Sequence, residues 1–325
     1  MKRTIGIFVA TLGIIAAVAC ANETGAQSYP DRPIKLVVVA PAGGTADLVA
    51  RTLASKLSER LGQQVIVDNR PSNAGILGYE MVARAEPNGY TLVLATGTLS
   101  TVQSLYPGIR FDPVKDFEPV AWVLSTPYVV TVRPSLPVAS MQDLIAYAKA
   151  RPGKLTYSGG TVGAQQHLSG ELLKRIHGVD LLYVPYKGSG SMLPDLLSGR
   201  IDVAIDNVLL MEPYIRSGQV RGLAVTGATR SQALPELPTV ADSGSPGFDV
   251  VGWFGVFAPA RTPEPIVHRL NAELAAIMRR PDVADPLVAQ GAKPESGDPD
   301  ELGKLLAREI SLWRRVIKDA NIRAE

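Results

Sequence analysis

The sequence of 325 residues predicts an α/β protein with two lobes joined by a two-segment hinge. Apolar strand-like runs alternate with segments of helical periodicity along nearly the whole chain, which is typical of mainly parallel sheets. A strand that runs through a glycine turn into a helix occurs twice, at residues 34–61 and 155–176. Apolar runs at 119–132 and 222–226 are placed to carry the chain into a second lobe and back. A chain of this length can form two cores.

The N-terminus has the pattern of a secretory signal peptide over residues 1–26. Lys2 and Arg3 precede an apolar run at 5–19 that is too short for a comfortable membrane span. Small residues end at Ala26, which we favour as the cleavage point and which leaves a mature chain without cysteine. The alternative is lipoprotein processing with a lipid anchor at Cys20, although the preceding Ala-Val-Ala is a weak signal for it. Either way, we expect the protein to be exported.

Composition excludes some classes of partner. Lys and Arg number 33 and Asp and Glu 31, so the formal charge is +2. Removal of Lys2, Arg3 and Glu23 with the signal peptide gives +1 (31 minus 30). No cluster of basic residues with interleaved aromatics occurs, which argues against nucleic-acid binding. No other apolar segment of about 18 residues exists in the sequence, so transport across a membrane would need partner proteins.

The first lobe begins with a buried strand at 34–40, followed by Gly43 and Gly44. The helix that starts at Thr45 has one apolar face, with Val49, Leu53, Leu57 and Leu61 at intervals of four. Strands are expected at 65–67 and 91–95, with a helix at 73–85 between them.

The second lobe repeats this logic. Its expected strands are 155–158, 181–184 and 201–205. One helix is expected after Ser140 and ends at Pro152-Gly153, and a second carries Leu168, Leu172, Leu173 and Ile176 on one face. Two more helices are expected at 192–197 and 209–217. Strand 222–226 then leads back, and strand 251–258 with helices that start at Pro263 and Pro299 completes the first lobe. The predicted domains are therefore 27–125 plus 228–325 for the first lobe and 126–227 for the second.

Both glycine turns are candidate anion sites. Glycine lets a ligand approach the backbone, and a helix N-terminus offers unpaired N–H groups and a positive dipole end. Polar residues near the carboxyl ends of the strands are placed to join them. The candidate ligand-binding residues are Ala42, Gly43, Gly44, Thr45, Asp47, Thr96, Thr98, Gly160, Thr161, Gly163, Ala164, Gln165, Asp206 and Asn207.

Several of these residues have a structural alternative. Asp47 lies in the first helical turn, where it either caps the helix or fixes the loop whose N–H groups hold the ligand. His167 either lines the cleft or has a capping or packing role. Lys187 either pairs with a second carboxylate or is solvated, and Trp253 and Phe254 either wall the pocket or pack in the core.

An ordered set of segments resembles the Bug family, the periplasmic solute-binding proteins of tripartite tricarboxylate transporters. The segments include YPDRPI (29–34), LGQQVIVDNRP (61–71), NGYTLVLAT (88–96), FDPVKDFEPV (111–120), PGKLTYSGG (152–160), VPYKGSG (184–190) and WFGVFAPARTP (253–263). The resemblance implies a periplasmic binding protein of type II-like fold that traps a small carboxylate between two lobes. This sequence departs from the family pattern in two places. Val39-Ala40 stand where the family usually has Pro-Phe, and residues 161–164 read Thr-Val-Gly-Ala where the family usually has Gly-x-Gly-Ser. We therefore transfer no relative's ligand.

The resemblance implies multi-span membrane partners, one small subunit and one large, for a monomeric binding protein. A periplasmic sensor acting on a two-component system is the alternative. An enzyme is disfavoured because the sequence has no GxSxG, P-loop, GxGxxG, CxxC or HExxH motif. We expect no catalytic residue, no metal and no cofactor.

Overall fold

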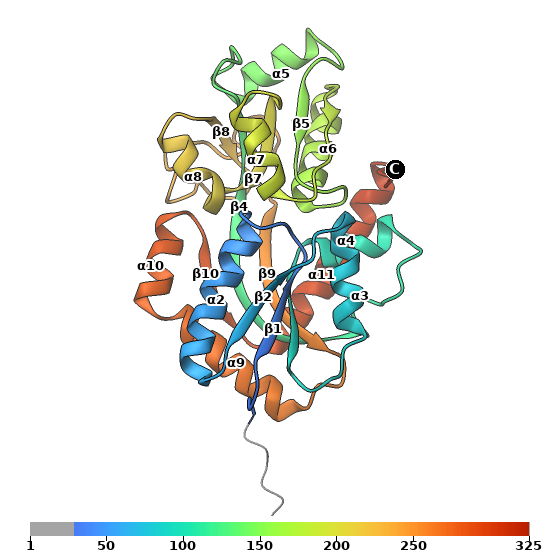
Figure 1. Cartoon of the computed structure of the whole chain (residues 1–325). Coiled ribbons are helices and arrows are strands. Elements are labelled where there is room, and N and C mark those ends of the chain that lie inside the picture. Colours follow the sequence, from blue (N-terminus) through green and yellow to red (C-terminus); the bar gives the residue numbers. More distant parts are fainter. Residues whose placement is uncertain (1–28, 325) are drawn as a thin grey trace, which may run out of the picture.

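The computed structural model describes residues 29–324, so the predicted signal peptide and Cys20 lie outside the described residues. The described chain folds into two α/β lobes, one above the other in Figure 1. A single strand, β4 (Phe117–Val132), runs through both. The fold class predicted from the sequence is confirmed.

The sheet of the first lobe has the order β2-β1-β3-β9-β4, with β10 beside β4. Strand β1 pairs with β2 and β3 in parallel, whereas β9 and β10 run antiparallel to β4. The bounds are Ile34–Val38 for β1, Val65–Asn69 for β2, Thr91–Thr96 for β3, Val251–Pro259 for β9 and Lys293–Gly297 for β10.

Helices cover both faces of this sheet. Ile34 and Leu36 pack with residues of α2 and α9, while Val37 on the opposite face packs with α3, α4 and α11. This two-sided burial explains the unbroken apolar run of β1. The bounds are Thr45–Leu61 for α2, Asn73–Gly75 for the 3₁₀ turn η2, Ile76–Ala83 for α3, Thr98–Leu105 for α4, Glu264–Met278 for α9, Pro281–Ala289 for α10 and Pro299–Asp319 for α11.

The second lobe is built on the far half of β4. Strand β7 pairs with β4 on one side and with β5 on the other, and β8 also pairs with β4. Its strands are β5 (Thr156–Ser158), β6 (Leu182–Tyr183), β7 (Val203–Asn207) and β8 (Arg221–Val225). Its helices are α5 (Met141–Lys149), α6 (Gln165–His177), α7 (Ser189–Leu197) and α8 (Val208–Arg216).

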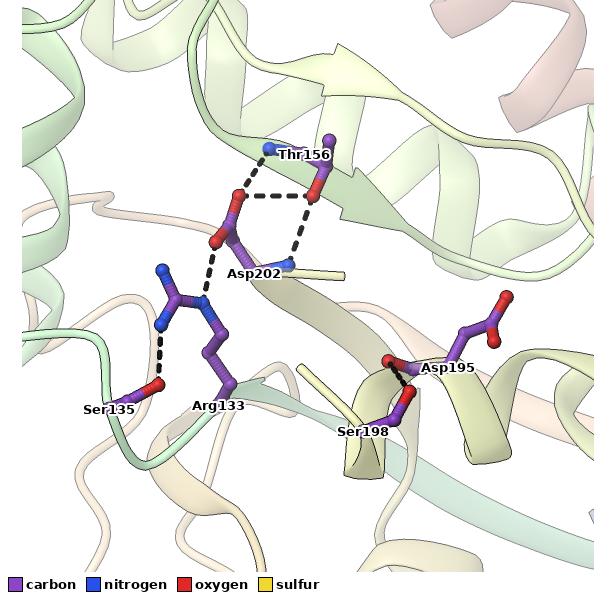
Figure 2. Close-up of polar contacts among 6 residues, drawn as sticks. All are labelled: Arg133, Ser135, Thr156, Asp195, Ser198 and Asp202. Carbon is purple, nitrogen blue, oxygen red and sulfur yellow. Dashed lines mark hydrogen bonds and ion pairs between the residues drawn. The ribbon is translucent and has the colours of Figure 1, made fainter. Parts of the chain in front are cut away.

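A polar cluster fastens the outer end of this second sheet (Figure 2). Asp202 Oδ1 accepts a hydrogen bond from Arg133 Nε at 2.7 Å. Its Oδ2 accepts from the Thr156 backbone N–H and hydroxyl at 2.9 and 3.0 Å. The carboxylate thereby joins β4, β5 and β7 at the end opposite to Asn207, and it serves the frame of the lobe.

The chain crosses between lobes at Pro127, which pairs with Val251 of β9, while the next residue, Tyr128, pairs with Asn207 of β7. The predicted boundaries at 125/126 and 227/228 stay a prediction. Val240, Phe248 and Val250 belong to the apolar cluster of the second lobe, and Val250 N–H donates to the Thr226 carbonyl at 3.0 Å. We therefore propose that the return crossing lies near Val250.

Candidate functional site

A cavity of about 650 Å³, including its open mouth, lies between the lobes. Its wall contains residues of the β1–α2 and β3–α4 loops of the first lobe and of the loops before α6, α7 and α8 of the second. Tyr128 of the crossing strand and Trp253 and Phe254 of β9 complete the wall.

Five helices begin at this cavity. Thr45, Thr98, Gln165 and Ser189 are the first residues of α2, α4, α6 and α7, and Asn207 is the N-cap of α8. Each N-terminus contributes unpaired N–H groups and about half a positive charge. Among the described residues that line the cavity, Lys187 alone has a charged side chain. The electrostatics of the cavity therefore favour an anion.

The first glycine loop is held by Asp47. Gly43 has a φ of +79° and donates its N–H to Asp47 Oδ2 at 3.0 Å, and Arg51 Nε donates to the same oxygen at 2.9 Å. Burial alone would raise the pKa of Asp47, but these two hydrogen bonds lower it below its ordinary value. Asp47 thus fixes the loop and uses the Gly43 N–H, which leaves Gly44 and Thr45 at the cavity.

The second glycine loop is held by a neutral histidine. Gly160 and Gly163 have φ of +75° and +85°, and the Gly163 N–H donates to His167 Nδ1 at 3.1 Å. Burial lowers the pKa of His167 to about 4, so its ring is uncharged at neutral pH with Nδ1 as the acceptor. The ring packs on Tyr183 with centroids 4.0 Å apart. His167 is therefore a positioning residue.

The two lobes contact each other around the cavity. Ala74 N–H donates to Thr161 Oγ1 at 3.1 Å, and Thr101 Oγ1 donates to the Gly163 carbonyl at 2.6 Å. A Cβ on Gly44 would lie 3.0 Å from the Gly190 nitrogen, so the backbones of the two lobes approach closely there. The two lobes are therefore in direct contact on the first and second glycine loops.

Gln165 uses both ends of its side chain within the protein. Tyr128 OH donates to its Oε1 at 3.0 Å, and its Nε2 donates to Glu309 Oε2 of α11 at 2.6 Å. Because the residue is 1% exposed and both polar atoms of its amide are hydrogen-bonded within the protein, its role at the cavity is to join α6 to the hinge strand and to α11.

Nine of the predicted ligand-binding residues line this cavity: Gly44, Thr45, Thr96, Thr98, Gly160, Thr161, Ala164, Gln165 and Asn207. The other five do not line it: Ala42 and Gly43 are exposed, and Asp47, Gly163 and Asp206 are buried. Asp206 is fully buried beside Asn207, and burial raises its pKa. The contribution of all fourteen to ligand binding stays a prediction.

Sequence reasoning missed several lining residues. Gly75, Gly97, Tyr128, Gly188 and Ser189 reach the wall from elements distant in sequence. Gly188 is the N-cap of α7 and Ser189 is its first residue, so a third strand-to-helix connection with glycines was the signal that could have revealed them. Trp253 and Phe254, for which packing was favoured, are both buried in the core and line the cavity.

Two lobes, two crossings and a cavity surrounded by helix N-termini define a solute-binding protein. Residues 49–322 match the family model described as the tripartite tricarboxylate transporter family receptor. The chain belongs to this family, the Bug family of periplasmic receptors, as its resemblance predicts. Within residues 29–324, every helix is too short or too polar to cross a membrane.

Individual relatives match over nearly their whole length. Protein BugT of Bordetella pertussis is 37% identical over 98% of this chain and 97% of its own. The structure of R. palustris Rpa4515 with adipate has a TM-score of 0.88 at 40% identity and covers 91% of this chain and 99% of its own. MatC from Rhodopseudomonas palustris with bound malate has a TM-score of 0.85 at 33% identity, with coverage of 89% and 100%.

Proposed function

We propose that this protein captures a small organic acid in the interlobe cavity and delivers it to a tripartite tricarboxylate-type transporter. The observation that carries this proposal is the convergence of five helix N-termini on a cavity whose one charged lining side chain, among the described residues, is Lys187. The carboxylate is bound by backbone N–H groups at the starts of α2 and α6, one from each lobe. Adipate and malate, the acids bound by two structural relatives, are the first candidates.

Binding from both lobes favours the closed arrangement. A ligand shifts the equilibrium between open and closed forms only by its differential contacts, and a carboxylate gripped from both sides makes its full set of contacts only in the closed form. The closed form is then the one that the membrane partners, one small and one large subunit, recognise. The protein acts as a periplasmic monomer that releases its ligand chemically unchanged.

Isothermal titration calorimetry of residues 27–325 against adipate, malate, succinate, citrate and their methyl esters tests this proposal. We expect at least one acid to bind with a dissociation constant of about 1 µM, which corresponds to about 8 kcal/mol. The ester of that acid should bind at least a hundredfold more weakly, because it lacks the charge that the helix N-termini stabilise. Equal binding of acid and ester, or no binding of any acid, would contradict the proposal.

A further inference from the structure

One side chain in the cavity wall has only half of its hydrogen-bonding capacity in use. Asn207 is 3% exposed, and within residues 29–324 its Oδ1 has no hydrogen-bond partner. Its Nδ2 donates across the cleft to Thr45 Oγ1 at 3.2 Å and within its own strand to Asp206 Oδ1 at 3.2 Å. A buried amide oxygen left without a donor is unfavourable. A ligand group that donates to it is therefore favoured at this point of the wall.

The hydrogen bonds fix which end of the amide is left open. Asp206 Oδ1 already accepts the Asn207 backbone N–H at 2.7 Å, so the NH₂ end of the side chain, not its carbonyl end, faces this oxygen. An asparagine at an N-cap commonly turns its oxygen to the helix N–H groups. Asn207 makes no such bond at the start of α8. Its oxygen thus receives no hydrogen bond from the start of α8, and the residue that carries it lines the cavity.

The charges around Asn207 indicate which kind of donor fits. A ligand ammonium would meet the positive ends of five helices and the Lys187 side chain. Asp206 is a poor counter-ion for it, because burial raises the pKa of this carboxyl and disfavours its charged form. A neutral hydroxyl donates a hydrogen bond without bringing a further positive charge.

We propose that Asn207 Oδ1 accepts a hydrogen bond from a hydroxyl group of the ligand, so that the site selects hydroxy carboxylates over acids that lack the hydroxyl. This inference rests on the proposed function and names the substrate class within it. The carboxylate occupies the helix N-termini, and the hydroxyl reaches the residue that ends β7.

Titration of the wild-type protein with pairs of acids that differ by one hydroxyl group tests the inference. The pairs are malate with succinate, and 2-hydroxyadipate with adipate. In at least one pair, the hydroxy acid should bind about tenfold more tightly than its partner. Affinities within twofold in both pairs would overturn the inference while leaving carboxylate capture intact. Failure of all four acids and of citrate to bind would overturn both.

Two variants test whether Asn207 Oδ1 is the atom that causes the preference for hydroxy acids. Asn207→Ala removes Oδ1 and should bring the hydroxy-to-deoxy affinity ratio close to one. Thr45→Val is the matched control: it removes one of the two acceptors of Asn207 Nδ2 but keeps Oδ1, so both affinities fall while their ratio persists. If circular dichroism shows that Asn207→Ala does not fold, Asn207→Ser takes its place. A ratio unchanged by loss of the asparagine would overturn the inference.

Discussion

The two glycine loops perform the same task in opposite lobes but are held by different chemistry. In the first loop, Gly43 is exposed and donates to the carboxylate of Asp47, which Arg51 also contacts. In the second, Gly163 is buried and donates to the neutral ring of His167. An ionised group suits the loop that borders solvent, whereas an uncharged acceptor avoids the cost of charge in the buried loop. In both, the acceptor lies four residues beyond the glycine.

This comparison separates binding from positioning. The glycine that takes the left-handed conformation, Gly43 or Gly163, gives its N–H to its own loop, so it does not hold the ligand with that group. The N–H groups that remain belong to the first helical turns of α2 and α6. Each loop is held by hydrogen bonds that need no ligand, and such preorganisation lowers the entropic cost of binding.

Replacement of each of the two glycines by alanine should give the largest difference in stability between the two loops. Both have positive φ, where an alanine costs about 1–2 kcal/mol. A Cβ on Gly43 meets nothing within 4 Å, whereas a Cβ on Gly163 would lie 2.4 Å from Leu105 Cδ1, and such overpacking costs about 1–3 kcal/mol more. Urea unfolding should therefore show Gly163→Ala destabilised by about 4 kcal/mol and Gly43→Ala by about 1–2 kcal/mol. Equal losses would mean that Leu105 moves aside.

The next largest effect is a pH dependence of the free energy of unfolding that comes from His167 in the second loop. The pKa of His167 falls from 6.5 to about 4 on folding, so between these values the unfolded chain binds the proton more readily. Stability that is present above pH 6.5 is then lost by about 1.4 kcal/mol per pH unit, or about 3 kcal/mol by pH 4. His167→Asn keeps an acceptor for Gly163 but does not titrate.

Urea unfolding from pH 7 to 4 measures this term as the difference between wild type and variant. The His167→Asn protein should lose about 3 kcal/mol less than wild type over this range. His268→Asn is the matched control, because that side chain is 64% exposed and distant from the cavity wall. Parallel curves for wild type and His167→Asn would contradict the assignment of a buried, neutral ring.

Most of the scaffold of these loops could be predicted because its signals are local. The apolar run of β1, the interval of four in α2 and the glycines between them appear in adjacent residues. The expected helix 73–85 instead divides into η2 and α3, since Ala74 and Gly75 both have positive φ. Helices α4 and α10 and strand β10 were not predicted.

The missed parts depend on contacts between distant residues. The hydroxyl-rich segment after β3 has only a short apolar stripe, formed by Leu99, Val102 and Leu105. It nevertheless forms α4, where Tyr79 bonds Thr98 at 2.9 Å and α11 packs alongside. A proline within α10 and the absence of alternation in β10 hid those elements. The N–H groups of Gly43 and Gly163 bond within their own loops only because of the rotamers of Asp47 and His167. The sequence does not determine these rotamers.

The smallest expected effect separates charge from hydrogen bonding in the first loop. Asp47→Asn keeps an acceptor for Gly43 and loses only the pair with Arg51, whose side chain is 59% exposed, so it should cost less than about 0.5 kcal/mol at pH 7. Asp47→Ala also removes the acceptor and should cost about 1 kcal/mol.

Because folding lowers the pKa of Asp47, its contribution is present above pH 3.8 and is lost as the pH falls through the folded value. Urea unfolding of both variants and of wild type from pH 7 to 3 tests this order. The stability that Asp47 contributes to the first loop should be lost only below pH 3.8, after the second loop has lost the stability that depends on neutral His167. A loss that began near pH 6 in wild type and vanished in Asp47→Asn would reverse the roles of the two loops.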